Sequence, residues 1–365
     1  MLISPMNRPV YNFRGDLIKE IIAKGYSVTV TGPDLINVEK ITDLGADFVE
    51  IPMKKTGTNI FSDLQYCYRL FKLIKKEKPD VTMGFTVKPV IYGAIAAKLA
   101  GVKHICSLIP GAGYTFTAKT FKAKVLGAIV RTLYRIAFKC ANVVIFQNPD
   151  DKKEFCDLKL VKPDKCKLVS GSGVNLERFT PKPLPATASF LMISRLLICK
   201  GVLVYLKAAD IIKKEFPDTK FYLLGKRYTE MQDVIPEDVF CDYVNRGIVE
   251  HFPETHDVRP YHEMSSVYVL PSYREGTPRT VLEAMAMGRP IITTDTNGCR
   301  ETVKDGINGF LVPIGDEFEL AEAMKKFILH PELIKQMGDE GIKYCTDKFD
   351  VKKVNKDMLN YLKIG

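Results

Sequence analysis

Short apolar runs alternate along the chain with longer stretches in which apolar residues recur every three or four positions. The short runs predict buried strands, and the longer stretches predict helices with one apolar face. In the first half the predicted strands are 27–31, 47–51, 81–84, 104–108, 143–146 and 167–170, and the predicted helices are 13–23, 61–75, 89–100 and 121–138. Strands and helices that alternate at this spacing predict a parallel sheet covered on both faces.

The alternation stops over residues 179–189, FTPKPLPATAS, where three prolines and no apolar period predict a linker between domains. It then restarts, with strands predicted at 190–193, 220–224, 267–270 and 290–294 and helices at 202–214, 279–287 and 318–329. We therefore expect an α/β protein with two parallel-sheet domains, residues 1–180 and 181–345. The remaining residues, 346–365, predict a helix that returns toward the first domain. Parallel sheets bind ligands beyond the carboxyl ends of their strands, so two facing sheets suit a reaction between two substrates.

The composition narrows the class of protein. No apolar run approaches the roughly 18 residues that cross a bilayer, and the opening MLISPMNRPVYNF lacks the features of a secretory signal. We therefore expect a cytoplasmic protein.

Nine cysteines without a C-x-x-C motif predict reduced thiols. Only Leu2 and Ile3 precede Ser4 and Pro5, which predicts either a short first strand or a start that lacks a few residues.

Positive charge is concentrated in the first half. The net charge is +10, and residues 51–150 alone contain 16 Lys and Arg against 4 Asp and Glu. Such an excess favours a polyanion or an anionic membrane surface, and a solvated basic face without a partner is the alternative. Nucleic-acid binding is less favoured because the basic stretch lacks a recognisable reading motif.

Residues 117–141, TAKTFKAKVLGAIVRTLYRIAFKCA, combine an apolar side with flanking cations. The flanking cations are Lys119, Lys122, Lys124, Arg131, Arg135 and Lys139. Few acidic residues, a strong amphipathic pattern and aromatic side chains are typical of a helix at a membrane interface. The alternative is a core helix with a solvated basic face.

The strongest motif is SYREGTPRTVLEAMAMGRPIITTD, residues 272–295. A predicted strand ends before it, a loop carries Glu275, Gly276 and Thr277, and a helix is expected to begin with Pro278 in its first turn. The amino terminus of a helix offers backbone amides and a positive dipole end to a phosphate or diphosphate. This loop is therefore a candidate anion site.

Glu275 and Glu283 are eight positions apart, one in the loop and one in the following helix. Carboxylates accept hydrogen bonds from vicinal hydroxyls, such as those of a ribose or a hexose. The pair could point into one pocket and bind a sugar. Alternatively, Glu283 is a solvated helix residue and Glu275 caps the helix.

Metal and dinucleotide chemistry is not indicated. No D-x-D occurs, and the five histidines show no ligand spacing, so we expect no metal site. Neither G-x-x-x-x-G-K-[ST] nor G-x-G-x-x-G is present.

The segment EGTPRTVLE, from Glu275 to Glu283, resembles the signature of the retaining nucleotide-sugar glycosyltransferases of family 4, which have the GT-B fold. Similarity extends over ISRLLICKG, VSGSGVNLERF, DVRPYHEMSSVYVLPSYREG and GCRETVKDGINGFLVP, and so over nearly the whole chain. In the first half, YNFRGDLIKEIIAKGYSV and FTVKPVIYGAIAAKLAGV resemble the members that extend lipid-linked sugars of bacterial surface polysaccharides or glycoprotein glycans.

The resemblance implies two Rossmann-like domains that face each other across a cleft, and a role for each motif residue. The implied catalytic residues are Glu275, Arg195 and Lys200, the implied donor-binding residues are these three with Gly276, Thr277, Pro278 and Glu283, and the implied acceptor residues are Lys88, Gly111 and Gly113. Arg195 and Lys200 would stabilise the departing diphosphate, Glu275 would orient the sugar, and Glu283 would hold the ribose.

The expected activity is retaining transfer of an N-acetylhexosamine or related hexose from a UDP-sugar to a saccharide on polyprenyl diphosphate, without a metal or cofactor. We expect the protein to lie on the inner face of the cell membrane, bound to anionic lipid through residues 117–141. A front-face reaction fits better than a double displacement, because neither glutamate is an evident nucleophile. A nucleotide-sugar epimerase and a non-catalytic binder of sugars or polyanions are the alternatives.

Overall fold

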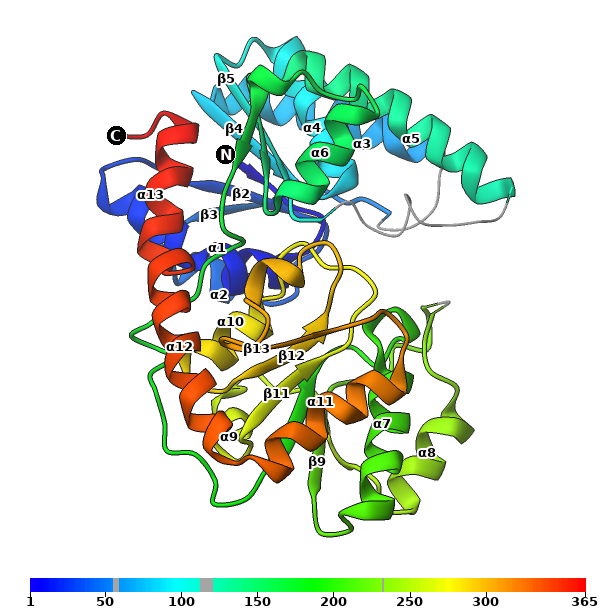
Figure 1. Cartoon of the computed structure of the whole chain (residues 1–365). Helices are drawn as coiled ribbons and strands as arrows, with labels where there is room; N and C mark the ends of the chain where they lie inside the picture. The colour runs from blue at the N-terminus through cyan, green and yellow to red at the C-terminus, as the bar shows by residue number, and fades with distance from the viewer. Residues whose placement is uncertain (55–58, 112–120, 232) are drawn as a thin grey trace. The chain divides into compact units, whose positions relative to one another are not determined.

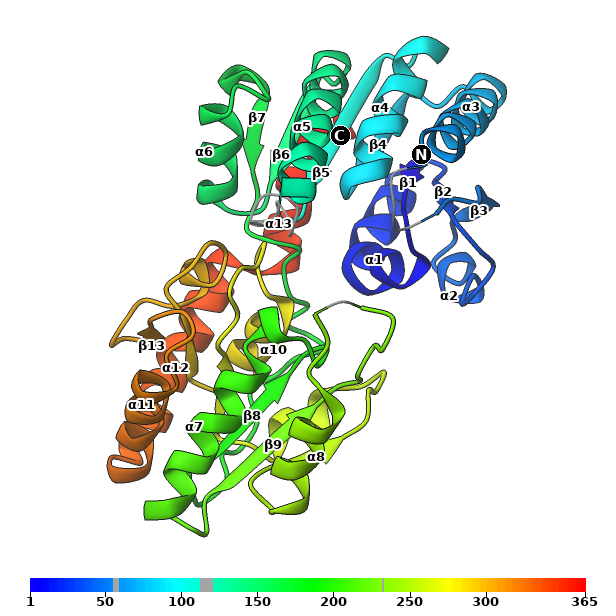
Figure 2. The same cartoon turned by 90° about the vertical axis from the view of Figure 1, so that its right-hand side faces the viewer.

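A parallel sheet lies at the centre of each of the two units into which the chain divides (Figure 1, Figure 2). Unit 1 comprises Met1–Ser172 and Val351–Gly365, and unit 2 comprises Gly173–Asp350. The computed structural model describes residues 1–54, 59–111, 121–231 and 233–365, apart from the side chains of 121–125.

The sheet of unit 1 has seven strands in the order β3-β2-β1-β4-β5-β6-β7, and all neighbouring pairs are parallel. The strands are β1 (Leu2–Ile3), β2 (Thr29–Gly32), β3 (Asp47–Glu50), β4 (Val81–Phe85), β5 (His104–Ile109), β6 (Val143–Phe146) and β7 (Cys166–Leu168). β1 has only two residues, yet it is a central strand, because Leu2 pairs with Val30 of β2 and with Met83 of β4.

Helices cover both faces of this sheet. They are α1 (Asn7–Ala23), α2 (Glu39–Thr42), α3 (Ile60–Glu77), α4 (Val87–Ala100), α5 (Phe121–Cys140), α6 (Pro149–Asp157) and α13 (Val351–Leu362), with a short 3-10 helix η2 (Pro163–Lys165). Side chains alternate along β5, as in any strand. Ile105 and Ile109 join the core that contains α3, α4 and α5, whereas Cys106 and Leu108 join the core that contains α1, α2 and α13.

The C-terminal helix α13 belongs to unit 1 although all of unit 2 precedes it in the sequence. Val354, Met358 and Leu359 are buried in the core beneath α1. The Asn355 amide donates a hydrogen bond to the Glu20 carboxylate of α1 at 2.7 Å. Unit 1 is therefore completed by the last segment of the chain.

The sheet of unit 2 has six parallel strands in the order β10-β9-β8-β11-β12-β13. The strands are β8 (Ser189–Ile193), β9 (Lys220–Leu224), β10 (Glu250–Phe252), β11 (Val267–Leu270), β12 (Ile291–Thr294) and β13 (Gly309–Val312). The helices are α7 (Val202–Glu215), α8 (Glu237–Asn245), α9 (Arg259–Glu263), α10 (Arg279–Ala286), α11 (Glu317–Leu329) and α12 (Glu332–Lys348), with η3 (Ile198–Lys200) and η4 (Arg300–Thr302). The expected architecture of two parallel-sheet domains is confirmed.

Residues 179–189, which the prolines predicted to be an interdomain linker, belong to unit 2 instead. Phe179 is buried in the core of that unit. The guanidinium of Arg289 is fully buried and donates hydrogen bonds to the carbonyls of Lys182 and Pro183 at 2.9 and 2.8 Å. The prediction was wrong because a distant arginine fixes this segment, and no pattern within the segment indicates that contact.

Among the described residues, no helix is both long enough and apolar enough to span a bilayer.

Candidate active site

The predicted donor residues of unit 2 come from loops that follow the carboxyl ends of neighbouring strands. Strands β8 and β11 pair in parallel, so the loops after them leave the same edge of the sheet. Arg195 and Lys200 lie in the loop after β8, and Glu275 lies in the loop after β11. This edge is where parallel sheets bind ligands.

Two glycines allow these loops to approach closely. Gly201 has a φ of +75°, and a Cβ atom there would lie 2.0 Å from the carbonyl oxygen of Pro271. Gly298, in the loop after β12, has a φ of +77°, and its Cβ would lie 2.3 Å from the carbonyl oxygens of Glu275 and Gly276. Only glycine adopts this backbone conformation without strain and leaves room for the neighbouring carbonyls. The backbone therefore fixes the position of the Glu275 loop.

Lys200 and Glu275 form an ion pair in which the ammonium nitrogen lies 2.5 Å from a carboxylate oxygen. Both side chains are largely shielded from solvent. The buried hydroxyl of Ser272 donates to the same carboxylate oxygen at 2.8 Å, and the Glu275 backbone amide donates to the carbonyl of Asn297 at 3.1 Å. The sequence reasoning did not identify Ser272, although it lies at the start of the motif 272–295.

Arg195 does not join this pair. Its side chain is exposed, and its guanidinium lies 3.5 Å from the sulfur of Met231. Because its side chain is exposed, Arg195 can change rotamer toward an anionic ligand without breaking a buried contact. The structure thus brings Lys200 together with Glu275 and leaves Arg195 at the rim of the same loop.

The helix α10 begins at Arg279, as the predicted range 279–287 has it, and Pro278 takes the cap position just before the first turn. Gly276 and Thr277 complete the loop before it, and the Thr277 hydroxyl donates to the carbonyl of Gly276 at 3.0 Å. The loop therefore leads into the amino terminus of a helix, as the motif predicted.

Glu283 is not a solvated helix residue. It is buried on α10, where Arg279 donates to its carboxylate at 3.1 Å. Burial raises the pKa of Glu283 above the usual range, while the charge of Arg279 acts in the opposite direction. A buried carboxylate with a raised pKa is a frequent feature of ligand sites.

Both glutamates act electrostatically on the buried side chain of Tyr268. Its buried hydroxyl donates to the Thr280 hydroxyl at 2.7 Å and lies 3.1 Å from the carbonyl oxygen of Ile193. Burial raises the pKa of Tyr268, and the negative charges of Glu283 and Glu275 add to the increase. Both glutamates therefore lie close enough to one hydroxyl to act on it electrostatically.

Two further groups were not foreseen from the sequence. Asp233 accepts a hydrogen bond from the Cys199 backbone amide at 2.9 Å and so braces the loop that carries Lys200. Burial raises the pKa of the Cys199 thiol to about 12, with Asp233 contributing, so this thiol stays protonated beside the site. Asp233 had no detectable signal in the sequence, because it lies outside every recognised motif.

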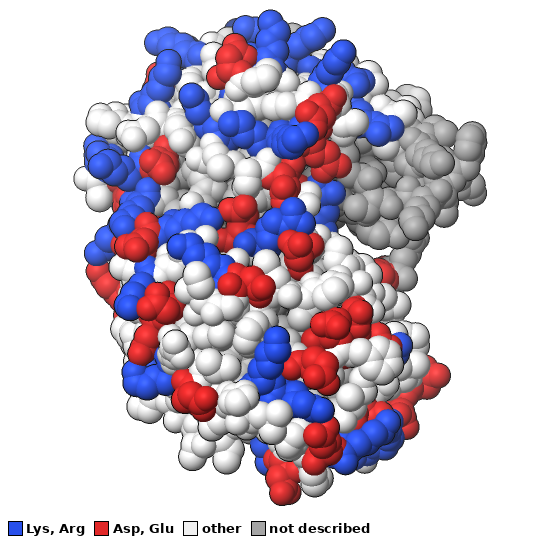
Figure 3. All heavy atoms as spheres, in the orientation of Figure 1, with Lys and Arg blue, Asp and Glu red and all other residues white. Residues whose placement is uncertain are grey.

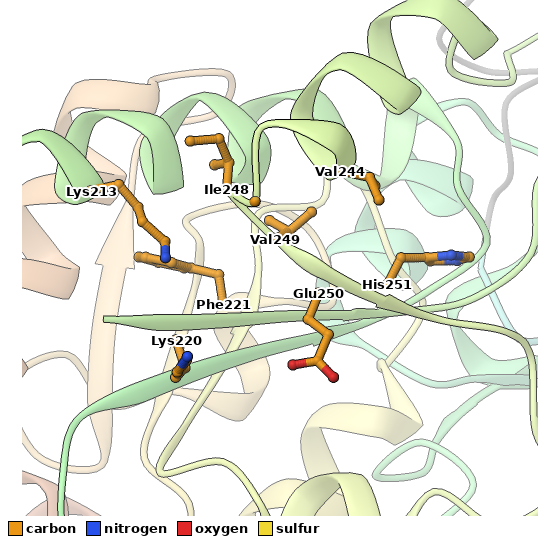
Figure 4. Close-up of a pocket in the computed structure, with 9 residues that line it drawn as sticks. Lys213, Lys220, Phe221, Val244, Ile248, Val249, Glu250 and His251 are labelled. Carbon is orange, nitrogen blue, oxygen red and sulfur yellow. The ribbon is translucent and has the colours of Figure 1, made fainter. Parts of the chain in front are cut away.

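A cavity of about 310 Å³ extends to Met287, just after α10, and Glu283 itself does not line it. Arg178 and Asp257 line it, and both act electrostatically on the Glu283 carboxylate. A larger cavity of about 400 Å³ lies elsewhere, at the amino ends of β9 and β10, where Lys220 and Glu250 line it (Figure 4). The larger cavity lies at the opposite edge of the sheet from the predicted donor residues, and none of these residues lines it.

In unit 1, the predicted acceptor residue Lys88 is held in an ion pair. Its ammonium lies 2.7 Å from the Asp63 carboxylate and 2.9 Å from the carbonyl oxygen of Lys54. The Tyr92 hydroxyl donates to the other oxygen of Asp63 at 3.2 Å. Lys88 is therefore a mostly buried cation whose position is fixed by Asp63 and the Lys54 carbonyl. Asp63 was not identified from the sequence.

Gly111 follows β5, next to β4, so it lies at the same edge of the unit 1 sheet as Lys88. Gly113 lies outside the described residues.

The basic segment 117–141 is described only in part, since residues 117–120 and the side chains of 121–125 lie outside the described residues. In the remainder of α5, Tyr134, Ala137 and Phe138 are buried in the core, whereas Ile129 and Ile136 are exposed. One side of α5 thus packs as a core helix. Lysine and arginine side chains gather on the upper part of the face shown in Figure 3, over unit 1.

Two family models match the chain. The model described as Glycosyl transferase 4-like matches residues 3–148, and the model described as Glycosyl transferases group 1 matches residues 187–330.

Relatives align over most of the chain. An N,N'-diacetylbacillosaminyl-diphospho-undecaprenol alpha-1,3-N-acetylgalactosaminyltransferase from Campylobacter jejuni is 27% identical over 94% of this chain and 93% of its own. A UDP-Gal:alpha-D-GlcNAc-diphosphoundecaprenol alpha-1,3-galactosyltransferase from Escherichia coli is 30% identical over 73% of this chain and 70% of its own.

Solved structures share the fold at low identity. Anabaena Alr3699/HepE in complex with UDP has a TM-score of 0.79 at 17% identity, and sucrose-phosphate synthase from Thermosynechococcus elongatus has a TM-score of 0.82 at 16% identity. Each match covers 99% of this chain and 98% of the other. Together with the two family models and the 30% identical relative, these matches show that the chain belongs to the family 4 glycosyltransferases of GT-B fold.

Proposed function

We propose that this glycosyltransferase moves an N-acetylhexosamine or a related hexose from a UDP-sugar to a saccharide carried on polyprenyl diphosphate. The observation that carries the proposal is the Lys200–Glu275 pair at the carboxyl edge of the unit 2 sheet, with Glu283 buried on the adjoining helix. A shielded cation paired with one carboxylate, and a second carboxylate buried on the adjoining helix, suit a ligand that combines a diphosphate with two sugar rings.

UDP is the nucleotide that the comparisons favour. Alr3699/HepE, which shares the fold, was solved with UDP and with UDP-glucose. In this chain we assign Glu283 to the ribose hydroxyls, Lys200 and Arg195 to the diphosphate, and Glu275 to the hydroxyls of the transferred sugar. The backbone of Gly276, Thr277 and Pro278 would approach the diphosphate and the sugar.

The acceptor is proposed from the relatives and from unit 1. Both relatives described above act, by their names, on a saccharide joined to diphospho-undecaprenol. Lys88 and Gly111 occupy one edge of the unit 1 sheet, and with Gly113 we assign them to the acceptor. Such an acceptor is anchored in a bilayer, so we place the protein on the cytoplasmic face of the membrane, with the basic segment 117–141 facing anionic lipid.

We propose retention of configuration without a metal ion. Glu275 already accepts hydrogen bonds from Lys200 and Ser272, which suits an orienting role more than nucleophilic attack. The acceptor oxygen would bond to the anomeric carbon on the face from which the diphosphate departs. Its proton would pass to the departing phosphate oxygen. Lys200 and Arg195 would stabilise the negative charge that develops on that diphosphate.

The experiment that tests the proposal is an assay of UDP release with a panel of UDP-sugars, with and without a lipid-linked acceptor. We expect release only when both substrates are present, and fastest with one UDP-N-acetylhexosamine. Release that is independent of acceptor would refute the transfer reaction. Turnover of a nucleotide sugar into its epimer without any acceptor would favour the epimerase alternative instead.

A further inference from the structure

The outer face of α3 carries exposed apolar side chains over about its first two and a half turns. Ile60, Phe61, Leu64 and Tyr68 are exposed, with Ile60 at 70% and Phe61 at 86% of the maximum. Phe61, Leu64 and Tyr68 follow the three-and-four spacing of one helical stripe. A helix on the surface of a water-soluble domain normally presents polar residues on this side, and a contiguous apolar stripe marks an interaction surface.

The same stripe continues as a row of cations. Lys72 and Lys75 are exposed at the next positions of the stripe, and Lys76 is exposed beside them. The ammonium of Lys72 lies 4.8 Å from the centre of the Tyr68 ring. The stripe therefore joins an apolar end to a cationic end along a helix of 18 residues.

The inner face of this helix reaches the proposed acceptor site. Asp63 lies between Phe61 and Leu64 in sequence but points inward, where its carboxylate holds Lys88 at 2.7 Å. A helix is only about 10 Å wide with its side chains. The exposed apolar residues and the braced Lys88 are thus separated by roughly one helix diameter.

Charge decides what covers this stripe. Residues 51–150 carry 16 basic and 4 acidic residues, so two copies of the chain that met through their α3 helices would bring like charges together. A bilayer with anionic headgroups satisfies both ends of the stripe, because acyl chains accept the apolar side chains and phosphates attract the lysines.

We propose that α3 is a membrane-docking helix, which inserts Ile60, Phe61 and Leu64 into an anionic bilayer and sets Lys72 and Lys75 against its phosphates. This inference rests on the proposed function, because a docked α3 would place Lys88 next to the membrane that holds the proposed polyprenyl-diphosphate acceptor. It adds a second contact to segment 117–141, which by itself lacks an exposed aromatic anchor among its described side chains.

The absence of tryptophan from the sequence allows a direct test. Phe61→Trp places a single fluorophore on the stripe, and Phe318→Trp places one at an exposed position of unit 2, 68% exposed on α11. With vesicles of equal phosphatidylcholine and phosphatidylglycerol, free of acceptor and UDP-sugar, we expect the Phe61→Trp emission to shift to the blue and to be quenched by brominated acyl chains. We expect Phe318→Trp emission to be unchanged. No shift for Phe61→Trp, or equal shifts for both, would overturn the proposal.

Binding variants give an independent measurement. In vesicle co-sedimentation, Phe61→Ser/Leu64→Ser should bind at least tenfold more weakly than the wild type, Lys72→Gln/Lys75→Gln should lose its preference for phosphatidylglycerol, and Phe318→Ser should bind normally. Undiminished vesicle binding by the serine variant would overturn the proposal. The proposal would also fail if the wild type formed a dimer and the serine variant became a monomer that still bound vesicles. Circular dichroism and thermal unfolding identify any variant that fails to fold.

The test separates this inference from the proposed function. Phe61→Ser/Leu64→Ser should transfer sugar to a water-soluble, short-chain diphosphate acceptor at the wild-type rate, because neither residue belongs to the acceptor site. Loss of that transfer in a folded variant would contradict a docking role. If vesicle binding follows the expected pattern but no lipid-linked acceptor is glycosylated, the docking helix stands and the proposed function fails.

Discussion

The ammonium nitrogen of Lys200 lies 2.5 Å from a carboxylate oxygen of Glu275, a residue 75 positions later in the sequence. The contact forms because Gly201 allows the first loop to reach the backbone of Pro271, immediately after β11. In the proposed complex a diphosphate would share Lys200 with Glu275, so the lysine is already oriented before the donor binds. A cation that is oriented in advance needs little reorganisation when negative charge develops.

Removal of the Lys200 charge should slow transfer. We expect Lys200→Met to lower kcat about 100-fold, because one fixed charge on the departing diphosphate would be lost. The matched control is Lys207→Met, which removes another lysine–glutamate pair of unit 2, with Glu317 at 3.0 Å. The control should keep kcat within about twofold of the wild type. Equal effects of the two substitutions, measured by initial rates of UDP release, would show that Lys200 has no special role.

Gly298→Ala should disturb the loop that carries Glu275. Its Cβ would lie 2.3 Å from two backbone carbonyl oxygens, in addition to the strain of a positive φ. We expect a loss of about 3 kcal/mol in the free energy of unfolding, together with weaker UDP binding.

The control for this substitution is Gly247→Ala, which has a similar φ of +67° and nothing within 4 Å of the added atom. It should lose only about 1 kcal/mol from backbone strain. Urea unfolding measures both values. If the two variants are equally stable, close packing around Gly298 does not hold the loop.

Glu283→Gln should stabilise the ligand-free protein at neutral pH. Burial raises the pKa of Glu283, so the folded state holds a proton that the unfolded state releases above pH 4.5. The stability of the wild type relative to the variant should therefore fall as the pH rises above 4.5. UDP affinity should fall in the variant, since the proposed ribose ligand is altered. A variant that is less stable than the wild type by the same amount at pH 5 and pH 8 would contradict this account of Glu283.

His262 should make the protein sensitive to acid. Neither of its ring nitrogens has a hydrogen-bond partner among the described residues, and burial, aided by the charge of Arg289, lowers the pKa of His262 to about 3. The unfolded state binds a proton near pH 6.5 and the folded state does not, so stability is retained above pH 6.5 and is lost as the pH falls toward 3. The slope should approach about 1.4 kcal/mol per pH unit between pH 6 and 4.

His262→Gln should remove this part of the slope, whereas His256→Gln, at an exposed position, should leave it unchanged. Chemical denaturation at several pH values measures the slope for all three proteins. An unchanged slope in His262→Gln would assign the acid sensitivity to other groups.

The sequence predicted the strands most closely where apolar runs are short and sharply bounded. The predicted bounds 143–146, 220–224 and 267–270 coincide with β6, β9 and β11. Helix α8 has nine residues and escaped prediction because so short an apolar stripe is weak evidence for a helix; its apolar side chains Val239, Phe240, Tyr243 and Val244 pack on the core but are only partly buried. The proline-rich segment 179–189 was misassigned as a linker because hydrogen bonds from Arg289 hold it against unit 2. Arg289 lies more than 100 positions later in the sequence, so no local pattern indicates this contact.

The candidate site was predictable only where a local motif marks it. The motif 272–295 indicated Glu275 and Glu283, and their similarity to a known signature added Lys200 and Arg195. The pairing of Lys88 with Asp63 was not predictable, because Asp63 belongs to the buried face of a helix 25 positions away. Arg279 was missed although its partner Glu283 lies four positions later on the same predicted helix, the spacing at which oppositely charged side chains meet.

The most direct test of the proposed transfer follows the sugar itself. Purified protein is incubated with a UDP-N-acetylhexosamine that carries a radiolabel in the sugar and with a polyprenyl-diphosphate-linked saccharide, and the label is partitioned between water and organic solvent. We predict that the wild type moves label into the lipid fraction, that mild acid releases it as a saccharide longer by one residue, and that Lys200→Met moves about 100-fold less per unit time. Label that stays in the aqueous phase for every UDP-sugar tried, or lipid labelling that is equally fast in Lys200→Met, would contradict the account.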